Sequence, residues 1–219
     1  MNNPPYPLHP SVSVREEIAN AVSHGVGALL SLVALILLVI SAINVTGFSR
    51  GPVILGFTLF GLSLLFLYLM STLYHSFPEG RVKATLQELD HAAIFVLIAG
   101  SYSAFCLSVL YESIGIWMFW TIWALAAIGI LSRFMFGKKS RKFALILYLI
   151  MGWLIISQYS VVISVLTPTE FYLILAGGIT YTVGFIFYAL QKLPWMHPIW
   201  HLFVLGGSTC HVLAALLIV

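Results

Sequence analysis

The chain has 219 residues, of which 61% are hydrophobic and only 8% are charged. Soluble domains carry about a quarter charged residues, so this composition excludes an ordinary soluble protein and predicts an all-α protein that crosses a membrane several times. The formal net charge of +3 does not indicate a nucleic-acid partner, because the basic residues gather at the ends of apolar segments.

Seven stretches are apolar and long enough to span a bilayer, which requires about 20 residues each. They cover approximately residues 22–43, 52–74, 88–110, 114–132, 143–165, 171–190 and 198–218. The connections are short, so we expect a single seven-helix membrane domain over residues 1–219, with a polar tail at residues 1–16. No short apolar core with a cleavage site precedes the first span, so we expect this tail to be retained. His9 lies in the tail, and no pattern there indicates a role for it.

The basic residues predict the orientation of the bundle, because Lys and Arg in short loops remain on the cytoplasmic side. Of the 10 Lys and Arg residues, only Arg50 lies outside the tail and the second, fourth and sixth loops. We therefore expect a cytoplasmic N-terminus and a C-terminus on the outside. The basic run at residues 137–142 is explained by this topology more simply than by a site for lipid headgroups or nucleic acid.

The last apolar segment opens with MHPIWHLFVLGGSTCH, residues 196–211. His197 and His201 are four residues apart, which places them on one face of a helix, about one turn from each other. Such a pair can bind one metal ion, although it can equally cap a helix or pack between helices. An ionisable residue at the edge of a membrane segment is costly and indicates a functional site. Pro198 disfavours helical angles at His197, so we expect that side chain to project from the helix start.

Three segments that are distant in the sequence bring ionisable groups to one level of the membrane. His75 ends the second segment, Asp90 lies at the start of the third, and His197 and His201 open the seventh. Three histidines with a fourth position left open are typical of a catalytic zinc site. We therefore predict that His75, His197 and His201 bind zinc.

Two further side chains at this level are candidate catalytic residues. Asp90 is placed to accept a hydrogen bond from a zinc-bound water or from the second ring nitrogen of a ligand, and the alternative is a carboxylate that caps the third helix. Ser71 lies one turn before His75 and can donate to a developing oxyanion. The alternative for Ser71 is a hydroxyl bonded back to its own helix.

Other polar residues have less direct roles in this interpretation. Glu17, Asn20 and His24 share one face of the first helix, where we favour a structural hydrogen-bond network over metal binding. His91 points about 100° away from Asp90 and is expected to face a neighbouring segment. His211 lies about 21 Å beyond His197 along the helix and cannot share its metal.

These residues fall in blocks that resemble the haemolysin III branch of the progestin and adipoQ receptor superfamily. The blocks are EIANAVSH at 17–24, STLYHSF at 71–77, LDHAAIFVLIAGSY at 89–102 and HPIWHLFVLGGSTCH at 197–211. The resemblance implies seven helices, a cytoplasmic N-terminus and a zinc ion near the cytoplasmic face, held by His75, His197 and His201, with Asp90 close to its water. The superfamily looks like a set of membrane hydrolases that includes alkaline ceramidases. The short tail is similar to that of bacterial members, which implies a multi-pass protein of the inner (cytoplasmic) membrane.

Two functions fit this set of residues. The first is a zinc-dependent, ceramidase-like hydrolase that acts on a lipid amide or ester in membrane-lipid homeostasis, with a membrane lipid as its substrate. The second is a non-enzymatic lipid sensor or regulator in which zinc is structural. An open coordination position favours the enzyme, and a closed site with four ligands favours the sensor. A third function, a pore-forming haemolysin, rests on the family name, and no segment carries a charged stripe that could line a pore.

Overall fold

The computed structural model describes residues 13–218, and within this range the chain is helical and contains no strand. Seven helical segments have the length and apolarity to cross a membrane, as the hydropathy pattern predicts. In chain order, the first three spans are α1 (Val14–Asn44), α2 (Arg50–Ser76) and α3 (Arg81–Cys106). The fourth span begins with a π-helical turn, η1 (Tyr111–Gly115), and continues as α4 (Ile116–Phe136), and the fifth covers Arg141–Val165. The sixth and seventh spans are α7 (Pro168–Ala189) and α8 (Met196–Ile218).

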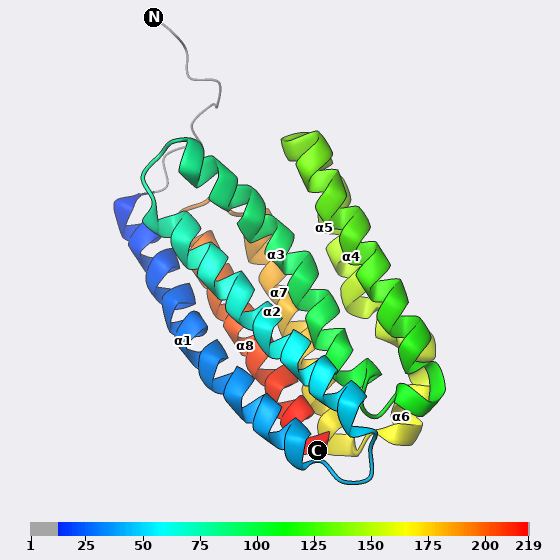
Figure 1. Ribbon diagram of the computed structural model, residues 1–219. Helices are drawn as coiled ribbons and strands as arrows, with labels where there is room; N and C mark the ends of the chain where they lie inside the picture. Colours follow the sequence, from blue (N-terminus) through cyan, green and yellow to red (C-terminus); the bar gives the residue numbers. More distant parts are fainter. Residues whose placement is uncertain (1–12, 219) are drawn as a thin grey trace, which may run out of the picture.

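Successive spans run antiparallel to one another along a single bundle (Figure 1). Pairs α1 and α2, α2 and α3, and α7 and α8 are neighbours in sequence and in space, and α8 also packs along α1. The start of α1, the end of α2, the start of α3 and the start of α8 therefore lie at the same end of the bundle, uppermost in Figure 1. This end holds the predicted site.

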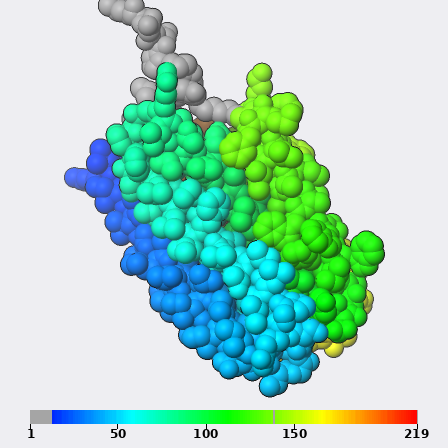
Figure 2. Space-filling model, in the orientation of Figure 1, coloured from blue at the N-terminus to red at the C-terminus, as the bar shows by residue number. Residues whose placement is uncertain are grey.

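The outer surface of the bundle is apolar. Figure 2 shows α1 and α2 on the outside of one face. The exposed side chains of α1 include Val22, Val26, Leu29, Leu30 and Val33. Such a surface is stable against lipid and unstable against water, in agreement with a multi-pass membrane protein.

Several helices extend beyond the apolar stretches that predict them. Helix α1 begins at Val14 because Ser13 and Glu16 form a capping box, in which each side chain accepts a hydrogen bond from the other residue's backbone N–H. Helix α1 thus includes the last three residues of the polar tail expected at residues 1–16. His9 and the proline-rich part of the tail lie outside the described residues. The third helix runs over 81–106 instead of 88–110, since polar residues continue it by two turns at its start.

The fifth span is interrupted, whereas the sequence predicts one continuous segment. It consists of α5 (Arg141–Trp153), a 3₁₀ turn, η3 (Leu154–Gln158), and α6 (Tyr159–Val165). At the break, the backbone N–H of Ile155 donates to the hydroxyl of Tyr102 on α3 over 2.9 Å. Insertion of a side chain into the ladder of backbone hydrogen bonds is a common cause of such an interruption.

Candidate metal centre

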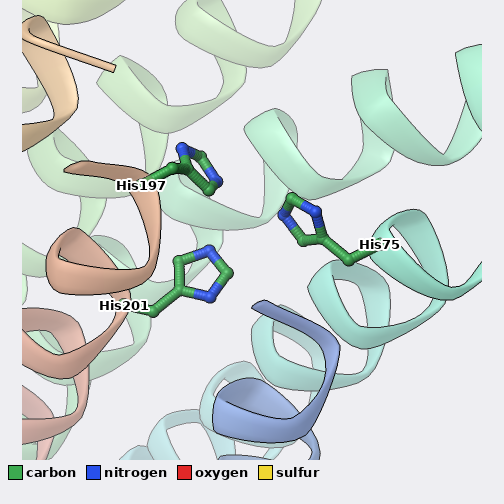
Figure 3. Close-up of side chains that lie close together, drawn as sticks. All are labelled: His75, His197 and His201. Atoms are coloured by element: carbon green, nitrogen blue, oxygen red, sulfur yellow. The ribbon is translucent and has the colours of Figure 1, made fainter. Parts of the chain in front are cut away.

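Three histidines meet at the end of the bundle where α2 ends and α8 begins (Figure 3). Each of His75, His197 and His201 offers a ring nitrogen, and these nitrogens lie within 4.8 Å of one another. The ring centroids are 5.1 Å apart between His75 and either partner, and 4.7 Å apart between His197 and His201. The convergence predicted from the ends of the apolar segments is therefore present.

The start of α8 holds its two histidines in a regular helical arrangement despite Pro198. The backbone N–H of Ile199 donates to the carbonyl of Trp195 over 3.2 Å, so the first turn is closed. Proline is tolerated in a first turn because the N–H groups there have no partner within the helix. The loop before α8 is attached to α1, since the N–H of Trp195 donates to Glu16 Oε1 over 2.6 Å.

The second nitrogens of two of these rings have partners on α1. His75 Nδ1 lies 2.6 Å from Glu17 Oε2. His201 Nδ1 lies 3.1 Å from the hydroxyl of Ser23. Both contacts leave Nε2 as the nitrogen available to a metal, which is the usual arrangement in zinc sites, where an outer partner fixes the other ring nitrogen.

The residues present fit a zinc ion. His75 Nε2 is buried, and no described residue hydrogen-bonds to it. Imidazole nitrogens bound to tetrahedral zinc lie about 3.4 Å apart, from Zn–N distances of about 2.0–2.1 Å. The observed upper limit of 4.8 Å therefore requires side-chain adjustment of about an ångström, which rotation of the rings can supply.

Ser71 lies one turn before His75 and does not adopt the alternative in which its hydroxyl bonds to its own helix. The side chain is buried, and among residues 13–218 its Oγ has no hydrogen-bond partner. Other hydroxyls on α2 do bond back, as Ser63 Oγ does to the carbonyl of Phe60 and Thr72 Oγ1 to that of Tyr68. The Ser71 hydroxyl is thus available to a ligand.

Asp90 lies more than two turns inside α3, which begins at Arg81, so it does not cap that helix. It lines the same cavity as Ser71, His197 and His201. The second nitrogens of His75 and His201 are held by Glu17 and Ser23, so Asp90 is not the partner of either nitrogen. The predicted role of Asp90 as acceptor for a zinc-bound water stays a prediction.

Glu17 contacts a histidine of the triad, a partner that the sequence does not predict for it. The sequence groups it with Asn20 and His24 in a structural network, but Glu17 bonds to His75, and also to Lys83 over 2.9 Å. The ring of His24 stacks on that of His201 at 3.5 Å. The side-chain polar atoms of Asn20 and His24 are buried, and they have no hydrogen-bond partner within residues 13–218. The polar stripe at residues 17, 20 and 24 on an otherwise apolar helix was the feature of the sequence that could have indicated this contact between α1 and the triad.

The other two histidines lie away from the triad, as expected. His91 Nδ1 donates to the carbonyl of Gln87 over 2.6 Å, and its Nε2 lies 3.1 Å from the hydroxyl of Tyr188 on α7. His211 lies ten residues beyond His201, about 15 Å along the helix, where its Nε2 donates to the carbonyl of Ile174. Neither belongs to the histidine cluster.

A cavity of about 120 Å³ extends from His197 and His201 into the bundle. Its polar wall includes Ser71, Asp90, His197 and His201, and most of the remaining wall is apolar or aromatic. A second cavity, of about 380 Å³, shares part of this lining and continues toward the other end of the bundle. The residues common to both cavities are Ser101, Tyr102, Gly152, Trp153, Gly178 and His211. The two cavities together form a mainly apolar space that ends at His197 and His201, next to His75.

Comparison with known proteins agrees with the motifs in the sequence. Residues 12–212 match the family model described as haemolysin-III related. The chain is 44% identical to the hemolysin-3 homolog of Bacillus subtilis (strain 168) over 196 residues, which is 90% of this chain and 91% of that protein. It is 46% identical to hemolysin-3 of Bacillus cereus over 195 residues, covering 89% of this chain and 88% of the relative.

A more distant similarity reaches animal proteins. The monocyte to macrophage differentiation factor of Homo sapiens is 28% identical over 162 residues, which cover 71% of this chain and 67% of the human protein. No solved structure matches the chain. The family match spans nearly the whole length and includes all three histidines, so the chain belongs to the haemolysin-III-related family of multi-pass membrane proteins.

Proposed function

We propose that this protein is a zinc-dependent membrane hydrolase that cleaves a lipid amide or ester. The observation that carries the proposal is that two of the three clustered histidines, His197 and His201, share the wall of one cavity with Ser71 and Asp90, and that this cavity continues as a mainly apolar space. An apolar channel that ends in a polar, metal-binding site matches a substrate with a long acyl chain and a carbonyl group at one end.

Each polar residue has a distinct task in this reaction. His75, His197 and His201 would hold zinc, which when bound lowers the pKa of its water and polarises a carbonyl. Asp90 accepts the proton that the attacking water loses. Ser71 donates a hydrogen bond to the oxygen that becomes negatively charged as the carbonyl is attacked. The apolar wall excludes water from the acyl chain and orients it.

The number of protein ligands favours the hydrolase over a structural zinc site. Among the described residues, the group able to hold a metal contains three histidines and no fourth donor. Catalytic zinc sites have three protein ligands and one open position, whereas structural sites are closed by four. The charge distribution predicts that this site lies at the cytoplasmic boundary of the membrane, where both water and acyl chains are available.

The test uses purified full-length protein in detergent micelles, analysed for metal and for release of fatty acid from an N-acyl amide lipid and a diacyl ester lipid. The wild type is expected to contain zinc and to release fatty acid. His201→Ala should lose both properties, whereas Asp90→Asn should retain zinc and lose turnover. Wild-type protein without zinc, or undiminished turnover in either variant, would contradict this mechanism. Zinc in a closed four-ligand site, with no hydrolysis, would instead support the lipid-sensor function.

A further inference from the structure

Glu17 joins three helices next to the histidine triad. Its Oε2 lies 2.6 Å from Nδ1 of His75 at the end of α2, and its Oε1 accepts a hydrogen bond from Nζ of Lys83 on α3 over 2.9 Å. Each carboxylate oxygen thus has one partner on a different helix. The contact to His75 connects residues 58 positions apart in the sequence.

The contact between Glu17 and His75 determines which ring nitrogen can bind a metal. An ionised carboxylate can only accept hydrogen bonds, so Nδ1 of His75 must carry the proton in this contact. A neutral imidazole has one protonated nitrogen, and the other nitrogen, Nε2, then carries the lone pair. His75 Nε2 is the atom that no described residue hydrogen-bonds to, and it belongs to the ring that faces His197 and His201.

Lys83 fixes the carboxylate in turn. Its side chain is only 8% exposed, and its Nζ also donates to the carbonyl of Phe77, just after α2, over 3.1 Å. A buried ammonium group without a counter-charge is strongly destabilising, and Glu17 is the nearer carboxylate to Lys83, at 2.9 Å against 3.9 Å for Glu79. The pair restricts rotation of the Glu17 side chain away from His75.

We infer that Glu17 is a positioning residue for the metal centre and that Lys83 holds it in place. Glu17 sets the tautomer and orientation of His75, in the manner of carboxylate–histidine–zinc triads. This inference rests on the proposed zinc site. The corresponding partner of His201 is the neutral hydroxyl of Ser23.

Three variants of the full-length protein separate positioning from structural support. In Glu17→Gln the shape is kept, but the charge is lost and the amide can present a donor to Nδ1, which favours the tautomer with the proton on Nε2. Lys83→Met removes the cation alone. The double variant E17Q/K83M removes both charges, so that no buried charge remains unpaired. Glu79→Gln is the matched control, because it removes the same charge from an exposed position. The Glu79 side chain lies 3.9 Å from Lys83 and is 71% exposed.

The measurements are the zinc dissociation constant, by competition with a chelator, the visible absorption of the Co²⁺-loaded protein, which reports coordination geometry, and the melting temperature. We expect E17Q to bind zinc about 10–100-fold more weakly and to alter the Co²⁺ spectrum. In E17Q/K83M the melting temperature should recover toward the wild type while zinc affinity remains low. Glu79→Gln should match the wild type in all three measurements.

Two results would overturn the inference while leaving the zinc site intact. The first is unchanged zinc affinity in E17Q. The second is recovery of zinc affinity together with the melting temperature in E17Q/K83M, which would assign Glu17 a structural role only. Wild-type protein that binds no zinc would instead refute the proposed function itself, so the two failures are distinguishable.

Discussion

Replacement of Ser71 by alanine should stabilise the protein while it reduces activity. The Ser71 hydroxyl is buried, and no described residue bonds to it. A buried hydroxyl without a partner costs about 1–3 kcal/mol, and alanine removes this cost with loss of a single oxygen atom. After allowance for the small void, we expect a gain of about 1 kcal/mol, equivalent to about 2–4 °C in melting temperature for a chain of this size.

The same substitution should slow hydrolysis. If Ser71 donates to the developing oxyanion, its loss lowers turnover about 10²–10³-fold, the usual effect of removing one such donor. Ser63→Ala is the matched control, because Ser63 is also a buried serine on α2 but donates to the carbonyl of Phe60 over 2.7 Å. Ser63→Ala should not increase stability and should leave turnover unchanged.

The assay combines thermal unfolding in detergent with fatty-acid release from the lipid that the wild type cleaves best. A lower melting temperature for Ser71→Ala would show that the hydroxyl has a stabilising partner and would refute the reasoning from its unpaired state. A higher melting temperature with full turnover would remove Ser71 from the catalytic residues.

Three other predictions follow from separate parts of the structure. His201→Ala should weaken zinc binding by at least about a hundredfold, since one of three ligands is lost from a site worth about 10 kcal/mol or more; metal analysis of purified protein checks this, and a full zinc content would exclude His201 as a ligand. Gly56→Ala should destabilise the bundle, because the new Cβ would lie 2.4 Å from the backbone oxygen of Ser103 and α2 and α3 would have to separate; an unchanged melting temperature would show that the interface yields easily. Tyr102→Phe leaves the N–H of Ile155 without its 2.9 Å acceptor and should cost about 1–3 kcal/mol, with faster hydrogen exchange confined to the break in the fifth span.

The sequence by itself predicts the seven spans and the level at which the candidate site lies. Membrane thickness sets the length of each apolar segment, and short loops force successive helices to alternate in direction. His75 at the end of one span must then lie at the same depth as His197 and His201 at the start of another. The i, i+4 spacing adds that the last two share a helix face, so the histidine cluster could be predicted before the helices were placed in space.

Only the tertiary structure decided the partners of these residues. Hydropathy does not specify how each helix is rotated about its axis, because the faces toward lipid and toward other helices are both apolar. This rotation brings Glu17 of α1 to His75 and Lys83, although its sequence position suggested Asn20 and His24 as partners. It likewise places Tyr102 against Ile155, where the fifth span breaks. Depth in the membrane follows from chain length, whereas contact between side chains follows from helix packing.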